Sequence, residues 1–483
     1  MKNIDEILDR NRSIETFIAD LKEKSTTPPT WSSIKEVLYP DNHKIVKDKI
    51  NRPDKVIKTE KGTRIEEAAR LSIGLEELLV ERISEFTFSL PVKREYVFDY
   101  NNDTHQDIVN AIEKIYENVD IDTVNMERGT SFFTSCEIFT LWYAVKTENN
   151  IYGFPSKYKL KCRTFSPDKD SVELYPLLDE YGDMKAFSIY YKTKETQSDE
   201  IEYFETWTKD KHYKWSNRGD GWEDEIVYRD GEDSVTYGDE IKILKIPGIY
   251  AWRDKPVYRT GTPELRQDIE YMHSRDTDVI AYNSAPVLKI AGAIKGQEQK
   301  GETRRIYRVE NGGDVSYVGW NQSTEATEKH IQRNIDWFWM LNQMPDVSFK
   351  NLQSLGNIGY DARQMMLTDA FLRIGKETKP FLQFFRREFN VIKAFLKKMN
   401  IKWDKDIDSI SCKFTIQPYN PKDEKYEIEK RIMANGGKAL ESQKESIMRY
   451  GKSSDVDKTL GEIQEEKEKE QQASLANIME GAV

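Results

Sequence analysis

Three carboxylates stand close together in "SPDKDSVE", at Asp168, Asp170 and Glu173, and could hold a magnesium ion. Carboxylate oxygens are ligands that Mg²⁺ commonly takes in enzymes that process nucleic acids. Acidic turns between strands are, however, more often solvated loops than metal sites. A metal-dependent nucleic-acid-processing enzyme is therefore one interpretation of the chain, and replacing Asp168 with alanine is its test.

No other group of residues has the spacing of a catalytic or metal site. "RIGKET", "NGGKALES" and "RYGKSSD" contain Gly-Lys without the earlier glycine that a phosphate-binding loop needs. Cys136 has no obvious general base near it, and Gly-x-Ser-x-Gly does not occur. No two histidines stand at metal-ligand spacing among His43, His105, His212, His273 and His330. The sequence predicts no catalytic activity, no cofactor and no bound metal.

Composition places the chain among soluble proteins of several domains. It has 483 residues, of which 38% are hydrophobic and 33% are charged. We expect no membrane span, because no run of roughly eighteen apolar residues occurs. The three cysteines are far apart and odd in number, which predicts free thiols and a reducing cytoplasm. The net charge of −11 argues against tight wrapping of nucleic acid, but is compatible with DNA that slides past.

Residues 345–361, "PDVSFKNLQSLGNIGYD", are polar and have no secondary-structure period. A structureless stretch of this length inside a compact domain is usually functional. An ordinary surface loop between two helices is the alternative. The side chains or backbones that could act here are Lys350, Asn351, Gln353, Gly356, Asn357 and Gly359.

Helical patterns flank this loop. One covers 262–283, with Thr262 at the N-cap and Pro263 after it, and a second covers 324–344. A third runs from Asp361 to Met399, where Pro380 predicts a kink near Lys376. Earlier in the chain we expect helices over 1–25, 63–86 and 105–119, and short strands over 150–260.

Two clusters of residues point to partners. Trp337, Phe338 and Trp339 are consecutive, and helical neighbours lie about 100° apart, so all three cannot face one core. This predicts contact with another chain or domain. Residues 284–323 read as a small α/β insert, whose cations could form a patch for phosphates or an acidic partner, or simply a solvated face: Lys295, Lys300, Arg304, Arg305 and Arg308.

The β-rich region contains aromatic residues that allow two interpretations. Trp207, Trp215 and Trp222 could form a stacking platform for single-stranded nucleic acid. The interpretation that we prefer is sheet core and subunit interface.

Several stretches together resemble one family. They are "PDNHKIVKDK" before "FSLPVKREY", the strands "FSPDKDSVELYPLLDEYGDMKAFSIYYK", the segment "IPGIYAWRDKPVYRTGTPELRQDIEYMHSRDTDVIAYNSAPVLKIAG", and "PDVSFKNLQSLGNIGYDARQMMLTDAF". In this order they are similar to the portal proteins of tailed double-stranded DNA bacteriophages, of the siphophage type. The resemblance covers about residues 35–470, and the charged first 30 residues depart from it.

The resemblance implies an α+β fold with an α/β wing, a two-helix stem, a small α/β clip, a long kinked helix and an α-helical crown. The expected parts are an N-terminal segment 1–34, wing 35–261, stem helices 262–283 and 324–344, clip 284–323, tunnel loop 345–361, kinked helix and second wing part 362–422, and crown and acidic tail 423–483.

The resemblance also implies a function and partners. Copies would form a dodecameric ring at one capsid vertex of the virion, after assembly in the host cytoplasm, with major capsid and scaffolding proteins around it. Double-stranded DNA of any sequence would pass through the channel, driven by the terminase large subunit. A head–tail adaptor protein would dock later, and no membrane is involved.

The resemblance assigns roles to the residues named above. Residues 345–361 would be the tunnel loop around DNA. Arg275, Lys329 and Arg333 of the stem would be candidate phosphate contacts, and the five cations of the insert would face DNA or a docking partner. A monomeric or dimeric adaptor scaffold without a channel remains an alternative, which the size in solution distinguishes.

Overall fold

The computed structural model describes residues 4–8, 12–59, 62–169, 172–194, 200–225, 227–229, 232–234, 243–283, 287–292, 294–300, 304–309, 314–318, 325–346, 365–419, 433, 442–445 and 456–480. The chain divides into two compact units. The first comprises Met1–Leu355 and Met365–Tyr419, and the second comprises Gly356–Gln364 and Asn420–Val483.

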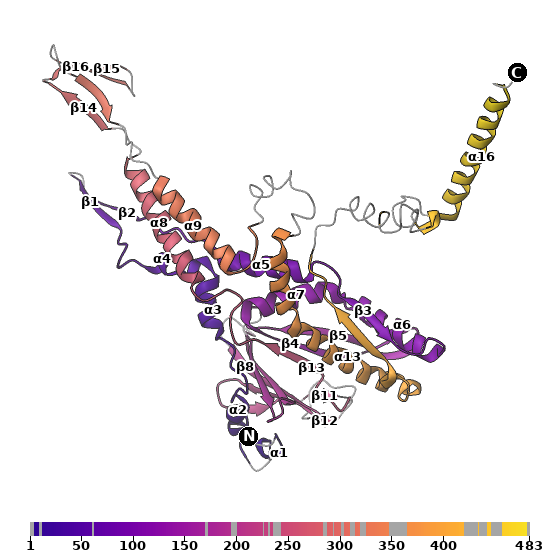
Figure 1. Ribbon diagram of the computed structural model, residues 1–483. Coiled ribbons are helices and arrows are strands. Elements are labelled where there is room, and N and C mark those ends of the chain that lie inside the picture. The colour runs from indigo at the N-terminus through magenta and orange to yellow at the C-terminus, as the bar shows by residue number, and fades with distance from the viewer. Residues whose placement is uncertain are drawn as a thin grey trace. The chain divides into compact units, whose positions relative to one another are not determined.

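Helices and strands both contribute substantially to the fold, which is α+β as predicted (Figure 1). The α-helices are α1 (Ile4–Ile7), α2 (Ile14–Leu21), α3 (Trp31–Leu38), α4 (Lys44–Lys47), α5 (Leu75–Phe88), α6 (Asp103–Asn118), α7 (Ile121–Ser135), α8 (Thr262–Asn283), α9 (Glu325–Leu341), α12 (Thr368–Glu377), α13 (Lys379–Met399) and α16 (Val456–Glu480). Short 3₁₀ helices span Pro40–Asn42, Ile401–Trp403 and Ile407–Ser409.

The strands outside residues 284–323 are β1 (Lys55–Thr59), β2 (Gly62–Glu66), β3 (Lys93–Val97), β4 (Glu137–Asn149), β5 (Ser156–Phe165), β6 (Glu173–Leu178), β7 (Met184–Lys194), β8 (Glu200–Thr208), β9 (His212–Asn217), β10 (Trp222–Asp224), β11 (Val227–Arg229), β12 (Glu232–Ser234), β13 (Gly248–Trp252) and β18 (Ser411–Thr415). The insert contains β14 (Val287–Ala291), β15 (Ile294–Lys300), β16 (Arg304–Val309) and β17 (Asp314–Val318).

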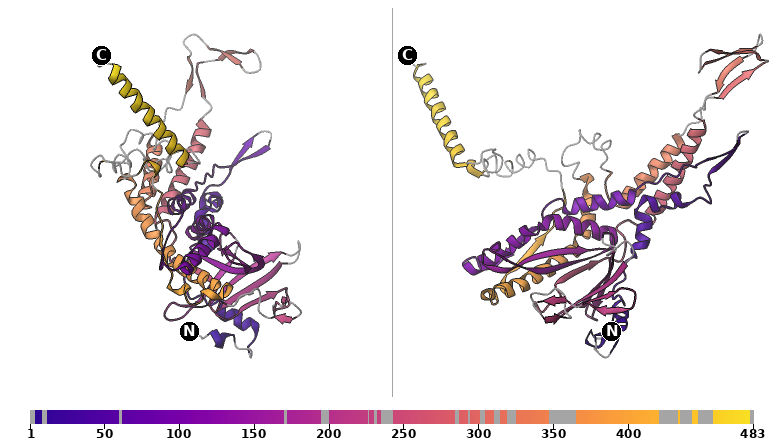
Figure 2. Two further views of the ribbon diagram at one scale, coloured as in Figure 1. Left: turned by 90° about the vertical axis from the view of Figure 1, so that its right-hand side faces the viewer. Right: turned by 180° about the vertical axis from the view of Figure 1, so that it is seen from behind.

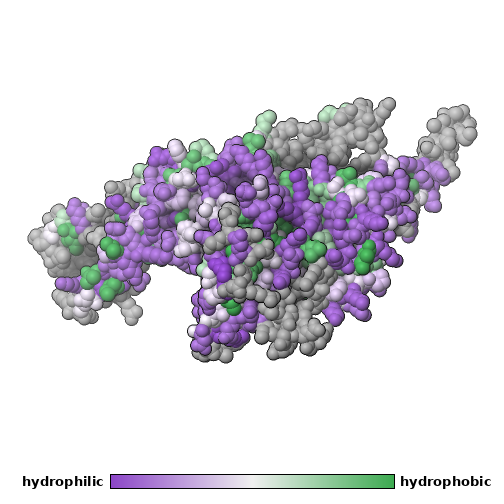
Figure 3. Space-filling view, turned by 90° about the horizontal axis from the view of Figure 1, so that it is seen from below, coloured by the Kyte–Doolittle hydropathy of each residue, from purple (hydrophilic) through white to green (hydrophobic). Residues whose placement is uncertain are grey.

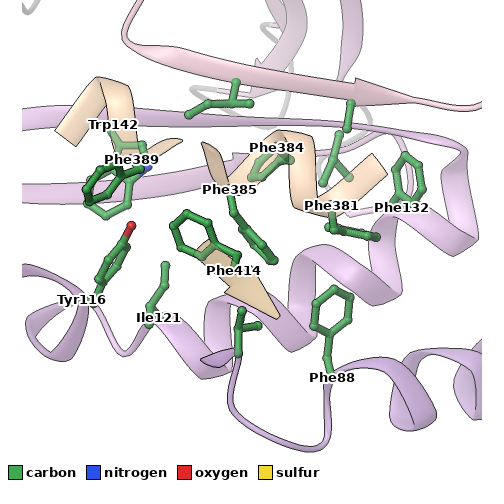
Figure 4. Close-up of a cluster of buried hydrophobic side chains, with 14 of the residues drawn as sticks. Phe88, Tyr116, Ile121, Phe132, Trp142, Phe381, Phe384, Phe385, Phe389 and Phe414 are labelled. Atoms are coloured by element: carbon green, nitrogen blue, oxygen red, sulfur yellow. The ribbon is translucent and has the colours of Figure 1, made fainter. Parts of the chain in front are cut away.

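The main core of the first unit lies around α13. Four phenylalanines in the first half of this helix recur at spacings of three and four residues, which places them on one face: Phe381, Phe384, Phe385 and Phe389. Phe381 meets Phe88 of α5 and Phe132 of α7 edge-on, with ring centroids 4.8 and 5.0 Å apart (Figure 4). The same cluster includes the sheet β13–β4–β5, so one helix joins both helical and sheet parts of the core.

A second sheet, in the order β10–β9–β8–β7–β6, is an antiparallel meander that the N-terminal helices cover on one face. Phe17 and Ile18 of α2 pack in one cluster with Phe204 and Trp215. Trp207 is buried in a different cluster. The interpretation of Trp207 and Trp215 as sheet core is confirmed. On the face that α2 covers, Trp215 is not accessible for stacking with nucleic-acid bases.

The N-terminal segment forms two helices instead of the single helix predicted over 1–25. Ser13 has the extended backbone angles φ −77° and ψ 155°, and α2 begins after it. Arg12 donates to the carbonyl oxygens of Glu6 and Ile7, both at 3.3 Å. These bonds satisfy carbonyls at the end of α1, which a continuing helix would otherwise use.

The helix predicted over 63–86 begins only at Leu75, so its first part is wrong. Residues 62–66 instead pair with 55–59 as the hairpin β1–β2. Between hairpin and helix, the backbone N–H groups of Ala69, Leu71 and Ile73 donate to side chains of α8, at 2.9–3.1 Å. These donors are therefore occupied by tertiary contacts, and the segment cannot make a helical hydrogen-bond ladder.

Other sequence predictions hold. The expected helix over 105–119 is α6, the strands over 150–260 are β5–β13, and the helix over 262–283 is α8. The kink is also confirmed: α12 ends at Glu377, and α13 starts at Lys379 with Pro380 in its first turn. Residues 361–364, where this long helix was expected to begin, lie outside the described residues.

The described part of the insert contains strands only, whereas an α/β insert was expected. β14 pairs with β17 and β15 pairs with β16, each pair antiparallel. β-branched and alternating residues in "VLKIA" and "RRIYRV" favour strands over the short helix that was expected.

In the second unit, the helix α16 confirms the prediction that the acidic tail contains helix. Most of residues 423–455 lie outside the described residues. None of the described helices combines the length and the apolar character needed to cross a membrane. Figure 3 shows a mostly hydrophilic surface on the face in view, with apolar residues scattered over it.

Candidate functional site

The helices α8 and α9 run side by side and carry the predicted stem positions (Figure 1). Asp268 of α8 joins them, because it accepts from Asn334 Nδ2 of α9 at 2.7 Å and lies 2.7 Å from His330 Nε2. Phe338 and Trp339 are buried near the C-terminal end of α9, while Trp337 is 51% exposed. One of the three consecutive aromatics therefore does face outward, as their spacing predicted.

The stem candidates all lie on the exposed surface of this helix pair. Arg275 is exposed on α8, and Lys329 and Arg333 are exposed one turn apart on α9. Lys329 pairs with Glu325 at 2.5 Å, and Arg333 Nη2 donates to His330 Nδ1 at 2.8 Å. An exposed pair of this kind contributes little stability, about 0–1 kcal/mol, so these cations can exchange partners.

The two helices together are acidic. They carry eight carboxylates against four lysine or arginine residues, a net charge of −4. A surface of this kind holds DNA weakly, since phosphate affinity depends on how many cations face the backbone.

The predicted loop starts from a fixed point at the end of α9. Asn342 is fully buried; its Nδ2 donates to Phe338 O at 3.0 Å, and its Oδ1 accepts from the backbone N–H of Arg259 at 2.9 Å. Gln343 follows with φ 53°, in the left-handed region that commonly ends a helix. These contacts set the direction in which the chain leaves α9.

Arg82 of α5 holds the next residues. It donates to Pro345 O at 3.0 Å, lies 3.6 Å from the Asp346 carboxylate, and covers the ring of Trp339 at 4.1 Å. Burial lowers the pKa of Arg82, and Asp346 opposes that shift.

Arg373 of α12 joins the helix that follows the loop region to the end of α9 that precedes it. Its Nη1 donates to Asn342 O at 2.8 Å, and its Nη2 donates to Val257 O in the segment before α8. Glu377 accepts from Arg373 Nε at 3.2 Å and pairs with Arg253 at 3.0 Å. Burial lowers the pKa of Arg373. α12 is thus bonded to Asn342, three residues before the predicted loop.

The loop residues themselves lie outside the described residues. This applies to Lys350, Asn351, Gln353, Gly356, Asn357 and Gly359. Their roles stay predictions, and the described geometry concerns only the supports on either side.

The structure brings the insert cations together on one pair of strands. Lys295 and Lys300 belong to β15, and Arg304, Arg305 and Arg308 belong to β16. The register places Lys300 opposite Arg304 and Arg308 opposite Gly296.

The carboxylates proposed for magnesium do not form a site among the described residues. Asp168 is partly buried, which raises its pKa, while hydroxyls of Ser166, Ser135 and Ser131 oppose that shift. Glu173 is exposed and accepts from the hydroxyl of Tyr175, and Asp170 lies outside the described residues. Within the described part of the chain, no group of three or more His, Cys, Asp or Glu residues could hold a metal ion.

Cys136 is buried, which raises the pKa of its thiol to about 12. It is therefore protonated at neutral pH and a poor nucleophile. All three cysteines are free thiols.

Sequence reasoning missed Arg82, Arg373 and the hairpin β1–β2. Nothing in a single sequence distinguishes a buried arginine that binds loop carbonyls from a solvated one. The hairpin had a signal, because "KVIKT" and "GTRIE" are short β-prone runs separated by two residues.

Comparison with known proteins gives one decisive match. The family described as "Phage portal protein, SPP1 Gp6-like" matches residues 32–473. No curated protein matches the chain in sequence. A chain from the neck of an empty GTA particle is similar at 10% identity and a TM-score of 0.34, over 78% of this chain and 88% of that one. Because the family match spans nearly the whole sequence, the chain belongs to the SPP1 Gp6-like family of phage portal proteins.

Proposed function

We propose that copies of this chain form a closed ring at a single capsid vertex, through which double-stranded DNA enters during packaging and leaves during ejection. Membership of the portal family supports this role and implies a component of the virion. The ring, its dodecameric state and its assembly in the host cytoplasm are parts of the proposal.

The observation that carries the proposal is the support of the loop. Its first residues are held by Arg82, and Arg373 joins α12, after the loop, to Asn342, before it. A loop that contacts moving DNA needs fixed ends, because force on its tip would otherwise displace the whole loop. α9 has 17 residues, roughly 25 Å of helix, and separates this loop root from the insert.

The loop would surround DNA without reading its sequence. Phosphate contacts position a duplex but carry no base information. Asn351, Gln353 and Asn357 would donate to phosphate oxygens, Lys350 would add one charge per copy, and the glycines Gly356 and Gly359 would let the backbone change shape.

The stem would line the channel with few cations on an acidic background. Arg275, Lys329 and Arg333 would give transient phosphate contacts, and the net charge of −4 on the two helices would keep DNA from binding tightly. Fast transport requires this balance, because a strongly basic channel would retain DNA.

The insert would be the docking site for other proteins. The terminase large subunit would bind there during packaging and a head–tail adaptor protein afterwards, while major capsid and scaffolding proteins would surround the ring. Lys300 opposite Arg304 supports an anionic partner, because like charges across a strand pair disfavour the pairing unless something neutralises them. Lys295, Arg305 and Arg308 would extend the patch.

The test replaces residues 348–360 with a short Gly-Ser linker in a packaging reaction with the phage's own capsid, scaffolding and terminase proteins. The matched control is Tyr181→Ser, in an exposed turn between β6 and β7. We expect both variants to form rings, and only the loop variant to protect less DNA from nuclease. Unchanged packaging by the loop variant would overturn the role of the loop.

A further inference from the structure

The hairpin β1–β2 exposes apolar side chains on both strands. Val56 and Ile65 lie opposite each other and are 62% and 66% exposed, and Ile50, before the hairpin, is 90% exposed. An isolated two-stranded hairpin is marginally stable in water and needs a surface to pack against. Figure 2 shows the hairpin diverging from α8 and α9, so the stem of its own chain does not supply that surface.

The base of the hairpin is fixed firmly to α8. Arg52 pairs with Asp278 at 2.5 Å and donates to Ala69 O at 2.9 Å, and Ala69 N donates back to Asp278 at 3.1 Å. Arg70, after β2, pairs with Asp54, before β1, at 2.8 Å, so the two segments at the base of the hairpin are joined. The hairpin is therefore an arm with a defined origin on the stem.

The charge of the arm is opposite to that of the stem. Its two strands carry Lys55, Lys58 and Arg64 against one carboxylate, Glu66, a net charge of +2. The helices α8 and α9 carry a net charge of −4. On α8, Asp276 and the 47% exposed Ile280 stand one turn apart, so an acidic and an apolar side chain share one side of the helix.

We propose that the hairpin β1–β2 of one copy packs against the stem helices α8 and α9 of a second copy. This inference rests on the proposed ring. In a ring whose stem helices follow the channel, cyclic symmetry places equivalent residues at equal height. The arm leaves α8 near Ser274 and Asp278, so it meets the half of the neighbouring stem that contains Asp276 and Ile280.

A second copy fits the observations better than another protein. The basic arm and the acidic stem belong to the same chain, so each copy brings both halves of a complementary contact. Every copy in a ring then both gives and receives one arm, so the apolar side chains of each hairpin are covered in the closed assembly.

The first experiment places a photoreactive benzoyl-phenylalanine at Val56 in the full chain and mixes isotopically heavy and light copies before assembly. The control carries the same group at Tyr181, which is 83% exposed. We expect heavy–light cross-links from position 56 to peptides of α8 or α9, and none to these peptides from position 181. Rings with cross-links only within one copy, to other regions or to a co-produced capsid protein would overturn the inference while leaving the proposed function intact.

The second experiment uses a double variant of the hairpin, Val56→Ser combined with Ile65→Ser. Its control is Val97→Ser, at a strand valine that is 61% exposed. Mass photometry would measure the protein concentration at which half of the copies are in rings. We expect this concentration to be higher by roughly tenfold or more for the hairpin double variant, and to be unchanged for the control. Equal values for both would count against the arm, and a wild-type chain that never forms rings would remove the proposed function and the inference together.

Discussion

Arg373 connects three segments of backbone through one buried guanidinium. Its partners are carbonyl oxygens of Asn342 and Val257 and the carboxylate of Glu377. Buried charges are tolerated only when paired in this way, and removing one partner leaves the others unsatisfied. The residue therefore acts on the loop through its supports, without contact to DNA.

Arg373→Ala should lower the free energy of unfolding by about 3–5 kcal/mol, because Glu377 and two carbonyl groups lose their donor. Urea unfolding followed by tryptophan fluorescence measures this. Arg386→Ala, at an exposed position of α13, is the control and should change stability by less than about 0.5 kcal/mol. Similar effects for the two variants would show that the buried bonds do not hold the loop root.

Glu76 at the start of α5 lies beside Arg266 of α8. Arg266 Nε is 2.9 and 3.1 Å from its two oxygens, and only the longer contact has the geometry of a hydrogen bond. Burial raises the pKa of Glu76 from 4.5 to about 7, and Arg266 opposes that shift. At pH values between about 4.5 and about 7, Glu76 therefore holds a proton in the folded chain that it has released in the unfolded chain.

This side chain should therefore make the protein less stable as pH rises from about 4.5 to about 7, by at most roughly 1.4 kcal/mol per pH unit. Glu76→Gln, which keeps the neutral shape, should remove that slope, whereas Glu81→Gln on the exposed side of α5 should retain it. Unfolding curves at several pH values between 5 and 8 give the comparison. The same slope in both variants would mean that Glu76 is not protonated in the folded chain.

At the scale of elements, the N-terminal segment has a structural role that the family match does not cover. The match begins at residue 32, yet α2 buries one face of the sheet β10–β6. Each fully buried apolar side chain contributes roughly 1.5–3 kcal/mol, and four on this segment are buried, namely Ile7, Phe17, Ile18 and Leu21.

Deleting residues 1–23 should expose Phe204 and Trp215, which are 0% and 2% exposed in the whole chain. We expect a red shift of tryptophan emission and increased binding of a hydrophobic dye. Phe17→Ser should produce part of the same change, and Thr16→Ser, on the exposed side of α2, should produce none. Unchanged emission after the deletion would contradict the packing of α2 on the sheet.

Periodic elements could be predicted from the sequence, and contacts between distant segments could not. The phenylalanine spacing of α13 and the break at Pro380 follow from local rules of helix geometry. The first part of the helix predicted over 63–86 is wrong because carboxylates and a serine of α8, about 200 residues away, accept from the backbone N–H groups of Ala69, Leu71 and Ile73. The buried pair of Arg128 and Glu388 likewise joins residues 260 positions apart.

The same limit applies to the candidate site. The loop was predicted from its polarity and lack of period, and the stem cations from the resemblance to the portal family. The supports of the loop depend on Arg82, Arg373 and the left-handed Gln343, whose roles arise only when α5, α9 and α12 come together. The resemblance to the portal family supplied the function, and the family match confirms that membership.

At the scale of the whole molecule, the proposed channel requires that copies of the chain assemble. The outward-facing Trp337, the uncovered hairpin and the charge difference between arm and stem are all features that one copy leaves unsatisfied. A closed ring would satisfy them together, since cyclic assemblies repeat one contact around an axis.

The most direct measurement is the mass and shape of the purified full chain, by light scattering and electron microscopy of the same sample. The account predicts a ring with an open centre and a mass of about twelve times the 56.6 kDa chain. A monomer or compact dimer that persists when the capsid and scaffolding proteins are produced with it would contradict the channel.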